Sequence, residues 1–193
     1  MKKRTAFIGA ILSLISLGQP LLIKIGVVLS TTGLMLSVPE KAKAESAEFY
    51  FNRAIDKKDV GDYYGAISDY TKAIEINPQY EKAYYNRGLS KRKLEDYYGA
   101  IDDYTKVIEI NPKYVDAYNN IAFVKRKKEI NDNYGAIFYA TKALEIDPNY
   151  SNAYLNRGVA KENLGDMNGA CDDWEKASSL GNEFTAEWVR KQC

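Results

Sequence analysis

The chain has 193 residues, two cysteines, no histidine and a formal net charge of +1. The missing histidine excludes a Ser-His-Asp triad, a Cys-His pair and an imidazole metal site, and two cysteines are too few for an all-thiolate zinc site or an iron–sulfur cluster. A net charge near zero gives no reason to expect a nucleic acid partner. We therefore expect no metal, no cofactor and no enzymatic activity.

The charge is unevenly distributed along the chain. Residues 1–44 carry six basic residues against one acidic residue, Glu40, whereas the remainder carries 21 basic and 25 acidic residues. All 16 tyrosines lie between Tyr50 and Tyr154. Two segments of different character therefore meet near residue 44.

The first of these segments, residues 1–44, has the features of a targeting or membrane segment. Between residues 5 and 38 the only charge is Lys24, which separates apolar runs of 19 and 14 residues. A basic start, an apolar core and a small-x-small end, here Ala42-Lys43-Ala44, are typical of a signal peptide. The longer run is also close to the length that spans a bilayer.

Three interpretations of residues 1–44 remain open. The segment is a signal peptide cleaved after Ala44, an uncleaved membrane anchor whose basic end stays in the cytoplasm, or a hairpin of two short spans. The first two place residues 45–193 outside the cytoplasm. We expect export to a periplasm, lumen or extracellular space, or membrane anchoring with the repeat domain outside the cytoplasm.

Four related units follow the first segment. Asn77-Pro78 recurs 34 residues later as Asn111-Pro112 and, after 36 more, as Asp147-Pro148. Self-similarity at such a period indicates a repeat protein. The third unit has two extra residues around Ile130–Asn133, between its halves. Units one to four span residues 47–80, 81–114, 115–150 and 151–184.

Each unit has the pattern of two amphipathic helices. Apolar residues recur at steps of three and four, the polar stretch Lys93–Asp96 interrupts them in unit two, and Asn111-Pro112 ends the second helix. The sequence therefore predicts an all-α chain of antiparallel helix pairs, each helix about 12–14 residues long. One pair cannot bury its own apolar face, so the units must stack. A glycine recurs beside the small alanine of each second helix, and we expect it to allow close helix contact.

The units resemble the tetratricopeptide repeat family. That family has aromatic residues at positions 4 and 24 of a 34-residue unit, small residues at positions 8, 20 and 27, and proline at position 32. This chain supplies most of them: Tyr50, Tyr84, Tyr118, Tyr154; Ala54, Gly88, Ala122, Gly158; Ala66, Ala100, Ala136, Ala170; Tyr70, Tyr104, Trp174; Ala73, Val107, Ala143, Ala177; Pro78, Pro112, Pro148. The departures are Ala140 at position 24, Asn182 at position 32, and arginine where position 7 usually holds leucine.

The resemblance implies an architecture for most of the chain. Residues 45–184 would form four repeats of a right-handed superhelical solenoid of antiparallel helix pairs. Residues 185–193, the end of an amphipathic stretch that starts near Phe184, would form a C-terminal capping helix.

The unusual arginines have a partner within their own units. Position 7 is arginine, and the position sixteen residues later is aspartate, in units one, two and four, whereas unit three has Ile121 and Tyr139. Positions equidistant from the turn of a helical hairpin face each other, and a buried charge without its partner is costly. We predict structural ion pairs: Arg53 with Asp69, Arg87 with Asp103, and Arg157 with Asp173.

The tyrosines at positions 4 and 24 are expected to pack between helices and not to stack on nucleic acid bases.

The two cysteines flank a break in the sequence. Cys171 opens the second helix of unit four, Cys193 ends the chain, and Gly181-Asn182 lies midway between them. Helices folded back at this break would bring the cysteines within the Cα distance of about 7 Å that a disulfide needs, and export would permit the bond. We predict a disulfide between Cys171 and Cys193; two unpaired core thiols are the alternative.

The resemblance also implies where a partner binds. In tetratricopeptide arrays the first helices line a concave groove through positions 2, 5, 6, 9 and 12. Position 6 is asparagine in all four units, and a row of carboxamides could hold a peptide backbone or could simply be solvated. Apolar neighbours suit an extended or helical peptide. The predicted groove residues are Asn52, Asn86, Asn120, Asn156, Phe51, Tyr85, Leu89, Phe123 and Leu155.

One binding mode of the family is not expected here. Its chaperone-binding members clamp a C-terminal carboxylate with lysine at position 5 and asparagine at position 9 of their first unit. This chain has Phe51 and Ile55 at those positions. We expect a non-enzymatic scaffold that binds a peptide or helix of a partner protein. The alternative is a membrane-tethered assembly or maturation factor for an envelope or photosynthetic membrane complex.

Overall fold

The computed structural model describes residues 27–30, 33–36 and 46–193, in two units that comprise residues 1–40 and 41–193. The first unit contains strands β1 (Val27–Ser30) and β2 (Gly33–Leu36), paired antiparallel with Val27 opposite Leu36. The apolar run over 5–23 and the expected cleavage site after Ala44 lie outside the described residues. In the part of the chain that is described, no helix is long and apolar enough to cross a membrane.

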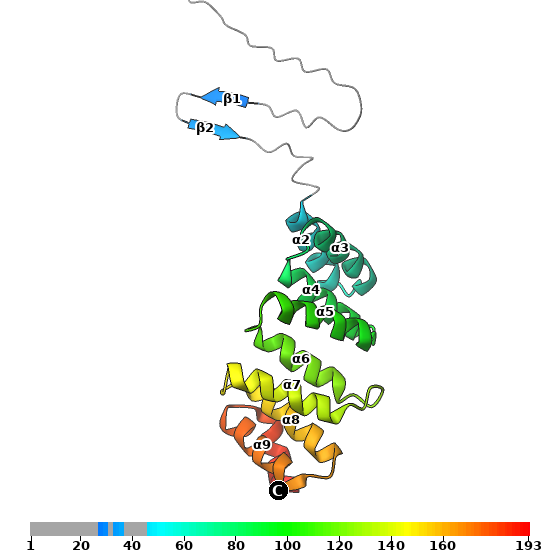
Figure 1. Cartoon of the computed structure of the whole chain (residues 1–193), viewed down its shortest axis with the longest axis vertical. Coiled ribbons are helices and arrows are strands. Elements are labelled where there is room, and N and C mark those ends of the chain that lie inside the picture. Colours follow the sequence, from blue (N-terminus) through cyan, green and yellow to red (C-terminus); the bar gives the residue numbers. More distant parts are fainter. Residues whose placement is uncertain (1–26, 31–32, 37–45) are drawn as a thin grey trace, which may run out of the picture. The chain divides into compact units, whose positions relative to one another are not determined.

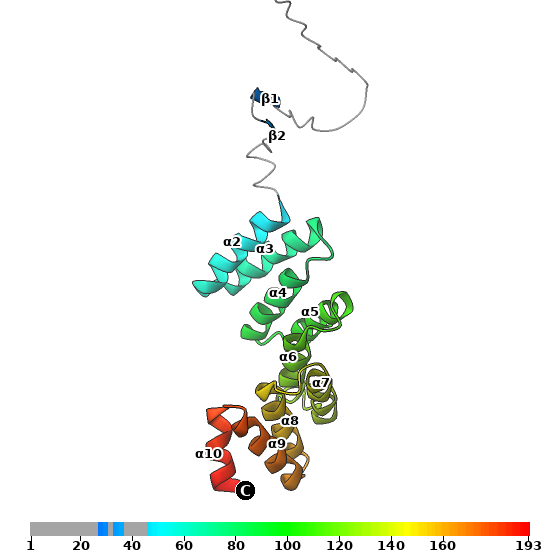
Figure 2. The ribbon, with the colours of Figure 1, turned by 90° about the vertical axis from the view of Figure 1, so that its left-hand side faces the viewer.

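Between residues 46 and 193, which are described without a gap, the chain folds into nine helices. Figures 1 and 2 show them as helix pairs stacked one after another. The all-α helical solenoid predicted from the sequence is confirmed. The helices are α2 (Ala47–Asp59), α3 (Tyr63–Ile76), α4 (Glu81–Lys93), α5 (Tyr97–Ile110), α6 (Val115–Lys125), α7 (Asn133–Ile146), α8 (Ser151–Asn163), α9 (Met167–Ser179) and α10 (Glu183–Gln192).

The second helix of every unit begins at an aspartate. The Asp62 carboxylate caps α3 by accepting a hydrogen bond of 2.9 Å from the Gly65 backbone N–H, and the same arrangement starts α5, α7 and α9. A Cβ at Gly65 would lie 2.0 Å from Asp62 Oδ2. The recurrent glycines, Gly65, Gly99, Gly135 and Gly169, therefore make room for the cap of their own helix. Our expectation that they serve helix–helix contact was wrong.

The turn between the paired helices differs in unit three. In the other units three residues connect the helices, whereas in unit three α6 ends at Lys125 and the connection runs from Arg126 to Asp132. The two extra residues of this unit are thus accommodated between its helices.

Aromatic and small residues fill the space between paired helices. Tyr70, Tyr104 and Trp174 at position 24 are completely buried, so they cannot stack on the bases of a nucleic acid.

The capping helix α10 begins at Glu183, two residues before the predicted start, because the Asn182 side chain caps it. Its Trp188 ring packs edge-on against Trp174, with 5.3 Å between the ring centroids. The solenoid therefore ends in an aromatic contact that extends its core.

Candidate binding groove

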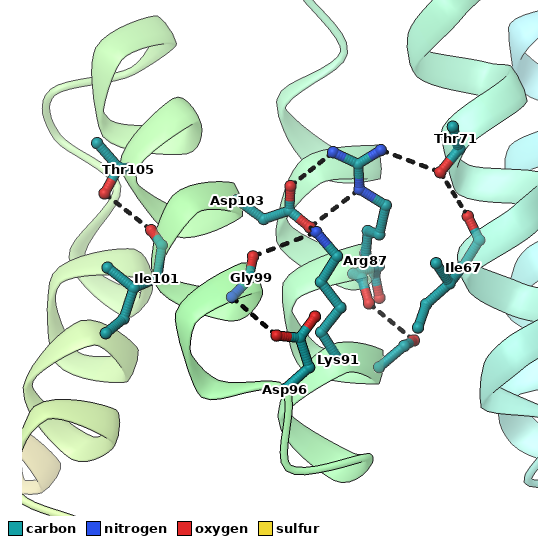
Figure 3. Close-up of polar contacts among 11 residues, drawn as sticks. Ile67, Thr71, Arg87, Lys91, Asp96, Gly99, Ile101, Asp103 and Thr105 are labelled. Atoms are coloured by element: carbon teal, nitrogen blue, oxygen red, sulfur yellow. Dashed lines mark hydrogen bonds and ion pairs between the residues drawn. The ribbon is translucent and has the colours of Figure 1, made fainter. Parts of the chain in front are cut away.

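The position 7 arginines join the two helices of their own units. Arg87 donates from Nε and Nη2 to the two carboxylate oxygens of Asp103, over 2.9 and 2.6 Å, and from Nη1 to Thr71 Oγ1 of the preceding unit. Figure 3 shows Arg87 between these two partners. Arg53 binds Asp69, and Arg157 binds Asp173, through the same two nitrogens. These side chains form structural links within the repeats and take no part in the groove described below.

A lysine that the sequence analysis did not single out completes each link. Lys57, Lys91 and Lys161, all at position 11, lie 2.8, 2.9 and 2.8 Å from the aspartate of their unit. Each aspartate is at most 4% exposed and so is buried between two cations. The hydrogen bond from Arg53, assisted by Lys57, lowers the pKa of Asp69 to about 2.

The two cysteines lie side by side at the C-terminal end of the solenoid. Cys171 and Cys193 form a disulfide, with 5.7 Å between their Cα atoms, so no cysteine is free between residues 46 and 193. The bond fastens the end of α10 to the start of α9. It closes a loop of 22 residues, for which a loop-entropy account gives about 3 kcal/mol of stabilisation.

The first helices of units two, three and four together line a pocket of 370 Å³. Six of its residues belong to the predicted groove: Tyr85, Leu89, Asn120, Phe123, Leu155 and Asn156. The pocket also contains six residues that were not singled out, from α4, α6 and the start of α8: Arg92, Asp116, Asn119, Arg126, Tyr150 and Asn152. Arg92 and Arg126 occupy position 12, which the family resemblance assigns to the groove, so the sequence held a signal for them.

The remaining predicted groove residues lie outside this pocket. Phe51 is buried in the core of unit one, where its ring lies 4.9 Å from that of Tyr80 and 5.7 Å from that of Tyr70. Asn52 is exposed and lines a separate depression at the N-terminal edge of the solenoid. Asn86 is half-buried and accepts a hydrogen bond from Lys58. The pocket that contains six of the nine predicted groove residues is therefore formed by units two to four.

Three of the four position 6 asparagines, Asn86, Asn120 and Asn156, form hydrogen bonds within the protein. Asn156 is 4% exposed, donates to Asn119 Oδ1 over 2.7 Å and accepts from Arg126 Nε over 2.9 Å. Asn120 is 8% exposed and donates to Tyr85 Oη and to the Asp116 carbonyl. In this arrangement both carboxamides stabilise contacts between neighbouring units and do not extend into the groove as a free row.

Titratable side chains at the two ends of the pocket have shifted pKa values. The Tyr150 hydroxyl donates to Asp116 Oδ1 near the start of α6, and burial, assisted by this carboxylate, raises the pKa of Tyr150. Burial raises the pKa of Tyr85 to about 12. At the other end, burial lowers the pKa of Arg126. The pocket therefore holds its acidic group, Asp116, near the N-terminus of α6. Its cations, Arg92 and Arg126, lie near the C-termini of α4 and α6.

Between residues 46 and 193, stacked helix pairs and a groove along their first helices define a helical-repeat protein. Residues 58–94, 81–114 and 139–172 match models of the tetratricopeptide repeat, and the chain belongs to the tetratricopeptide repeat family. Repeats of this family serve as scaffolds for protein–protein interaction. No group of three acidic, cysteine or histidine side chains in the described residues could hold a metal ion.

Solved structures with this fold include proteins called MamA. One MamA crystal structure is 26% identical, with a TM-score of 0.67 over 76% of this chain and 84% of that one. MamA 41-end from Desulfovibrio magneticus RS-1 is 21% identical, with a TM-score of 0.66 over 72% and 78%. TTC0263, a thermophilic TPR protein in Thermus thermophilus, is 19% identical, with a TM-score of 0.59 over 70% and 75%. No curated protein matches the chain.

Proposed function

We propose that the chain is a non-enzymatic scaffold that holds a peptide or helix of a partner protein in the groove of α4, α6 and α8. The observation that carries this proposal is the pocket to which three consecutive units contribute both apolar and polar side chains. Ligand sites commonly combine an apolar lining with a few directed polar groups. Leu89, Phe123 and Leu155 supply the apolar lining here, and Arg92 and Asn152 the polar groups.

Site-specific photo-cross-linking in the native host tests this proposal. A photoreactive amino acid replaces Leu155 in the groove or, in a matched control, the exposed Phe138 on the second helix of unit three. We expect a discrete cross-linked partner from position 155, identified by mass spectrometry, and none from position 138. The same products from both positions, or products from position 138 alone, would contradict groove binding.

We also propose that the repeat domain works outside the cytoplasm. The disulfide between Cys171 and Cys193 supports this proposal, because such bonds persist in oxidising compartments and are rare in the cytosol. The basic, apolar character of residues 1–44 agrees with it. Mass spectrometry of the mature N-terminus would distinguish a free domain, which begins at Glu45, from a tethered one that retains Met1. Thiol labelling of both cysteines in the native protein without prior reduction would contradict the disulfide.

A further inference from the structure

Three cations surround one aromatic ring in the groove, near the C-terminal ends of α4 and α6. The centroid of the Phe123 ring lies 4.9 Å from Arg92 Cζ, 4.9 Å from Arg126 Cζ and 4.9 Å from Lys127 Nζ. No two of these charge centres are therefore more than 9.8 Å apart. We call Arg92, Arg126 and Lys127 the Phe123 cluster.

No acidic side chain forms an ion pair with the Phe123 cluster. Among the ion pairs of residues 46–193, none includes Arg92, Arg126 or Lys127. Arg126 donates only to the neutral oxygen of Asn156, and the buried Nε of Arg92 has no hydrogen-bond acceptor. Charges this close repel within a Debye length of about 10 Å, and partly buried charges are screened less. The three cations of the cluster therefore have no ion-pair partner within residues 46–193.

The internal structure of the protein explains the cluster only in part. Cations near the C-termini of α4 and α6 interact favourably with the helix dipoles, and the Phe123 ring attracts cations to its faces. Neither effect provides an acceptor for Arg92 Nε. Asp116, the acid of the same pocket, is hydrogen-bonded to Tyr150 and precedes Arg126 by ten helical residues, or about 15 Å. Asp59 lines a second pocket with Arg92 but forms its ion pair with Lys58. The cluster can therefore accept an anion from outside residues 46–193.

We propose that the Phe123 cluster binds the carboxylates of an acidic segment of the partner protein. This inference rests on the groove function proposed above and adds the chemistry of the partner. Guanidinium groups bind carboxylates through two parallel hydrogen bonds, and the Nη1 and Nη2 nitrogens of Arg92 and Arg126 form no hydrogen bond within residues 46–193. The apolar side chains of the same pocket, Leu89 and Leu155, would contact aliphatic residues that flank the acidic ones.

Charge argues against the other possible occupants of the cluster. The chain's own residues 1–44 carry a net charge of +5, and three cations would repel them. A nucleic acid binds through many phosphates to an extended basic surface, whereas this cluster has three cations on a domain with a net charge of −4. A short acidic peptide matches the size and the sign of the cluster.

Isothermal titration calorimetry with two synthetic peptides tests the inference on the full chain. One peptide repeats Glu-Glu-Leu-Ser, the other has glutamine in place of glutamate, and both are acetylated and amidated. We expect the glutamate peptide to bind at least about tenfold more tightly in low salt, and this preference to decrease as salt screens the charges. The variant R92Q/R126Q/K127Q should lose the preference.

A second triple variant controls for the change in net charge. K72Q/K106Q/K142Q removes three lysines from equivalent positions of the second helices and should keep the preference for glutamate.

Equal affinity for both peptides, or no binding of either, would overturn the acidic partner, whereas cross-linking from position 155 would still support the groove. Cross-linking from positions 138 and 155 alike would overturn the groove, whatever the peptides do. Tighter binding of a single-stranded oligonucleotide, or dimerisation that R92Q/R126Q/K127Q abolishes, would also refute the proposal.

Discussion

Unit three and the other three units hold their paired helices together by different chemistry. In unit two, Arg87 and Lys91 enclose the Asp103 carboxylate, which is 3% exposed. In unit three the corresponding positions hold Ile121, completely buried, and the half-buried Tyr139, whose ring lies 6.4 Å from that of Tyr118. The helices pair in both cases. The fold therefore requires that facing positions complement each other and does not require a particular chemistry.

The lysine at position 11 shows how unit three adapts to the loss of its aspartate. Lys125 lies over the Tyr139 ring, at 5.6 Å, and its Nζ binds Asp132, the cap of α7, over 2.7 Å. In units one, two and four the equivalent lysine binds the buried aspartate. The second-helix cap thus supplies the counter-charge when the central carboxylate is absent.

Packing at positions 8 and 24 also differs between the units. In unit two Gly88 faces Tyr104, and a Cβ on Gly88 would lie 2.7 Å from Tyr104 Cε1. In unit three the same two positions hold Ala122 and Ala140, both completely buried. Unit one combines Ala54 with Tyr70, both also completely buried, so the helices of different units enclose this pair of positions in three ways.

The largest expected effect comes from removing one member of an ion pair. Asp103→Asn leaves Arg87 and Lys91 without the carboxylate between them, and we expect the free energy of unfolding to fall by about 3 kcal/mol. Urea denaturation followed by circular dichroism measures the change.

Transplanting the residues of unit three provides the control. Arg87→Ile with Asp103→Tyr removes both charges, and Lys91 can then bind Asp96 as Lys125 binds Asp132. We expect this double variant to be more stable than Asp103→Asn. If it is equally destabilised or worse, the ion pair has a role that apolar packing does not replace.

A smaller effect is expected from filling the space beside Tyr104. Gly88→Ala should lower the free energy of unfolding by about 2 kcal/mol, because the new methyl group overlaps a buried ring. In the background of Tyr104→Ala the same change should be neutral or stabilising, since alanine is a better helix former than glycine by about 1 kcal/mol. A double-mutant cycle measures the coupling, and additive effects would contradict direct packing.

Lowering the pH should reduce the stability of a unit with a central ion pair more than that of a unit without a central carboxylate. Arg53 lowers the folded-state pKa of Asp69 to about 2, so the pair stabilises the protein above the unfolded-state pKa of about 4, and this contribution is lost as the pH falls toward 2. We expect a loss of up to about 2 kcal/mol, reduced because Arg53 is 40% exposed. Arg53→Ile with Asp69→Tyr should make unfolding less sensitive to pH over this range. An identical pH profile would show that Asp69 does not contribute.

Features that depend on distance along a helical hairpin could be predicted from the sequence. The repeat period, the separation of sixteen residues between Arg87 and Asp103, and the position of the break between the cysteines are all of this kind. The hydrogen bonds of Asn120 and Asn156 within the protein could not be predicted in this way. Their partners, Tyr85 and Asn119, belong to the preceding units and lie 35 and 37 residues away in the sequence. The Phe123 cluster was missed because stacking brings Arg92 of unit two to Arg126 and Lys127 of unit three, while the net charge of the chain conceals these cations.

The smallest expected effect concerns the turn that joins the paired helices. Units one and four place Gly61 and Gly165 there with φ of +84° and +82°, whereas unit two has Glu95 with φ of +63°. A side chain in this left-handed region costs roughly 1 kcal/mol relative to glycine. Glu95→Gly should therefore raise the free energy of unfolding by about 0.5–1 kcal/mol, and Gly61→Ala should lower it by a similar amount. Unfolding curves for the two variants give the comparison. If Glu95→Gly were destabilising, the Glu95 side chain would have to stabilise the turn by more than its backbone strain.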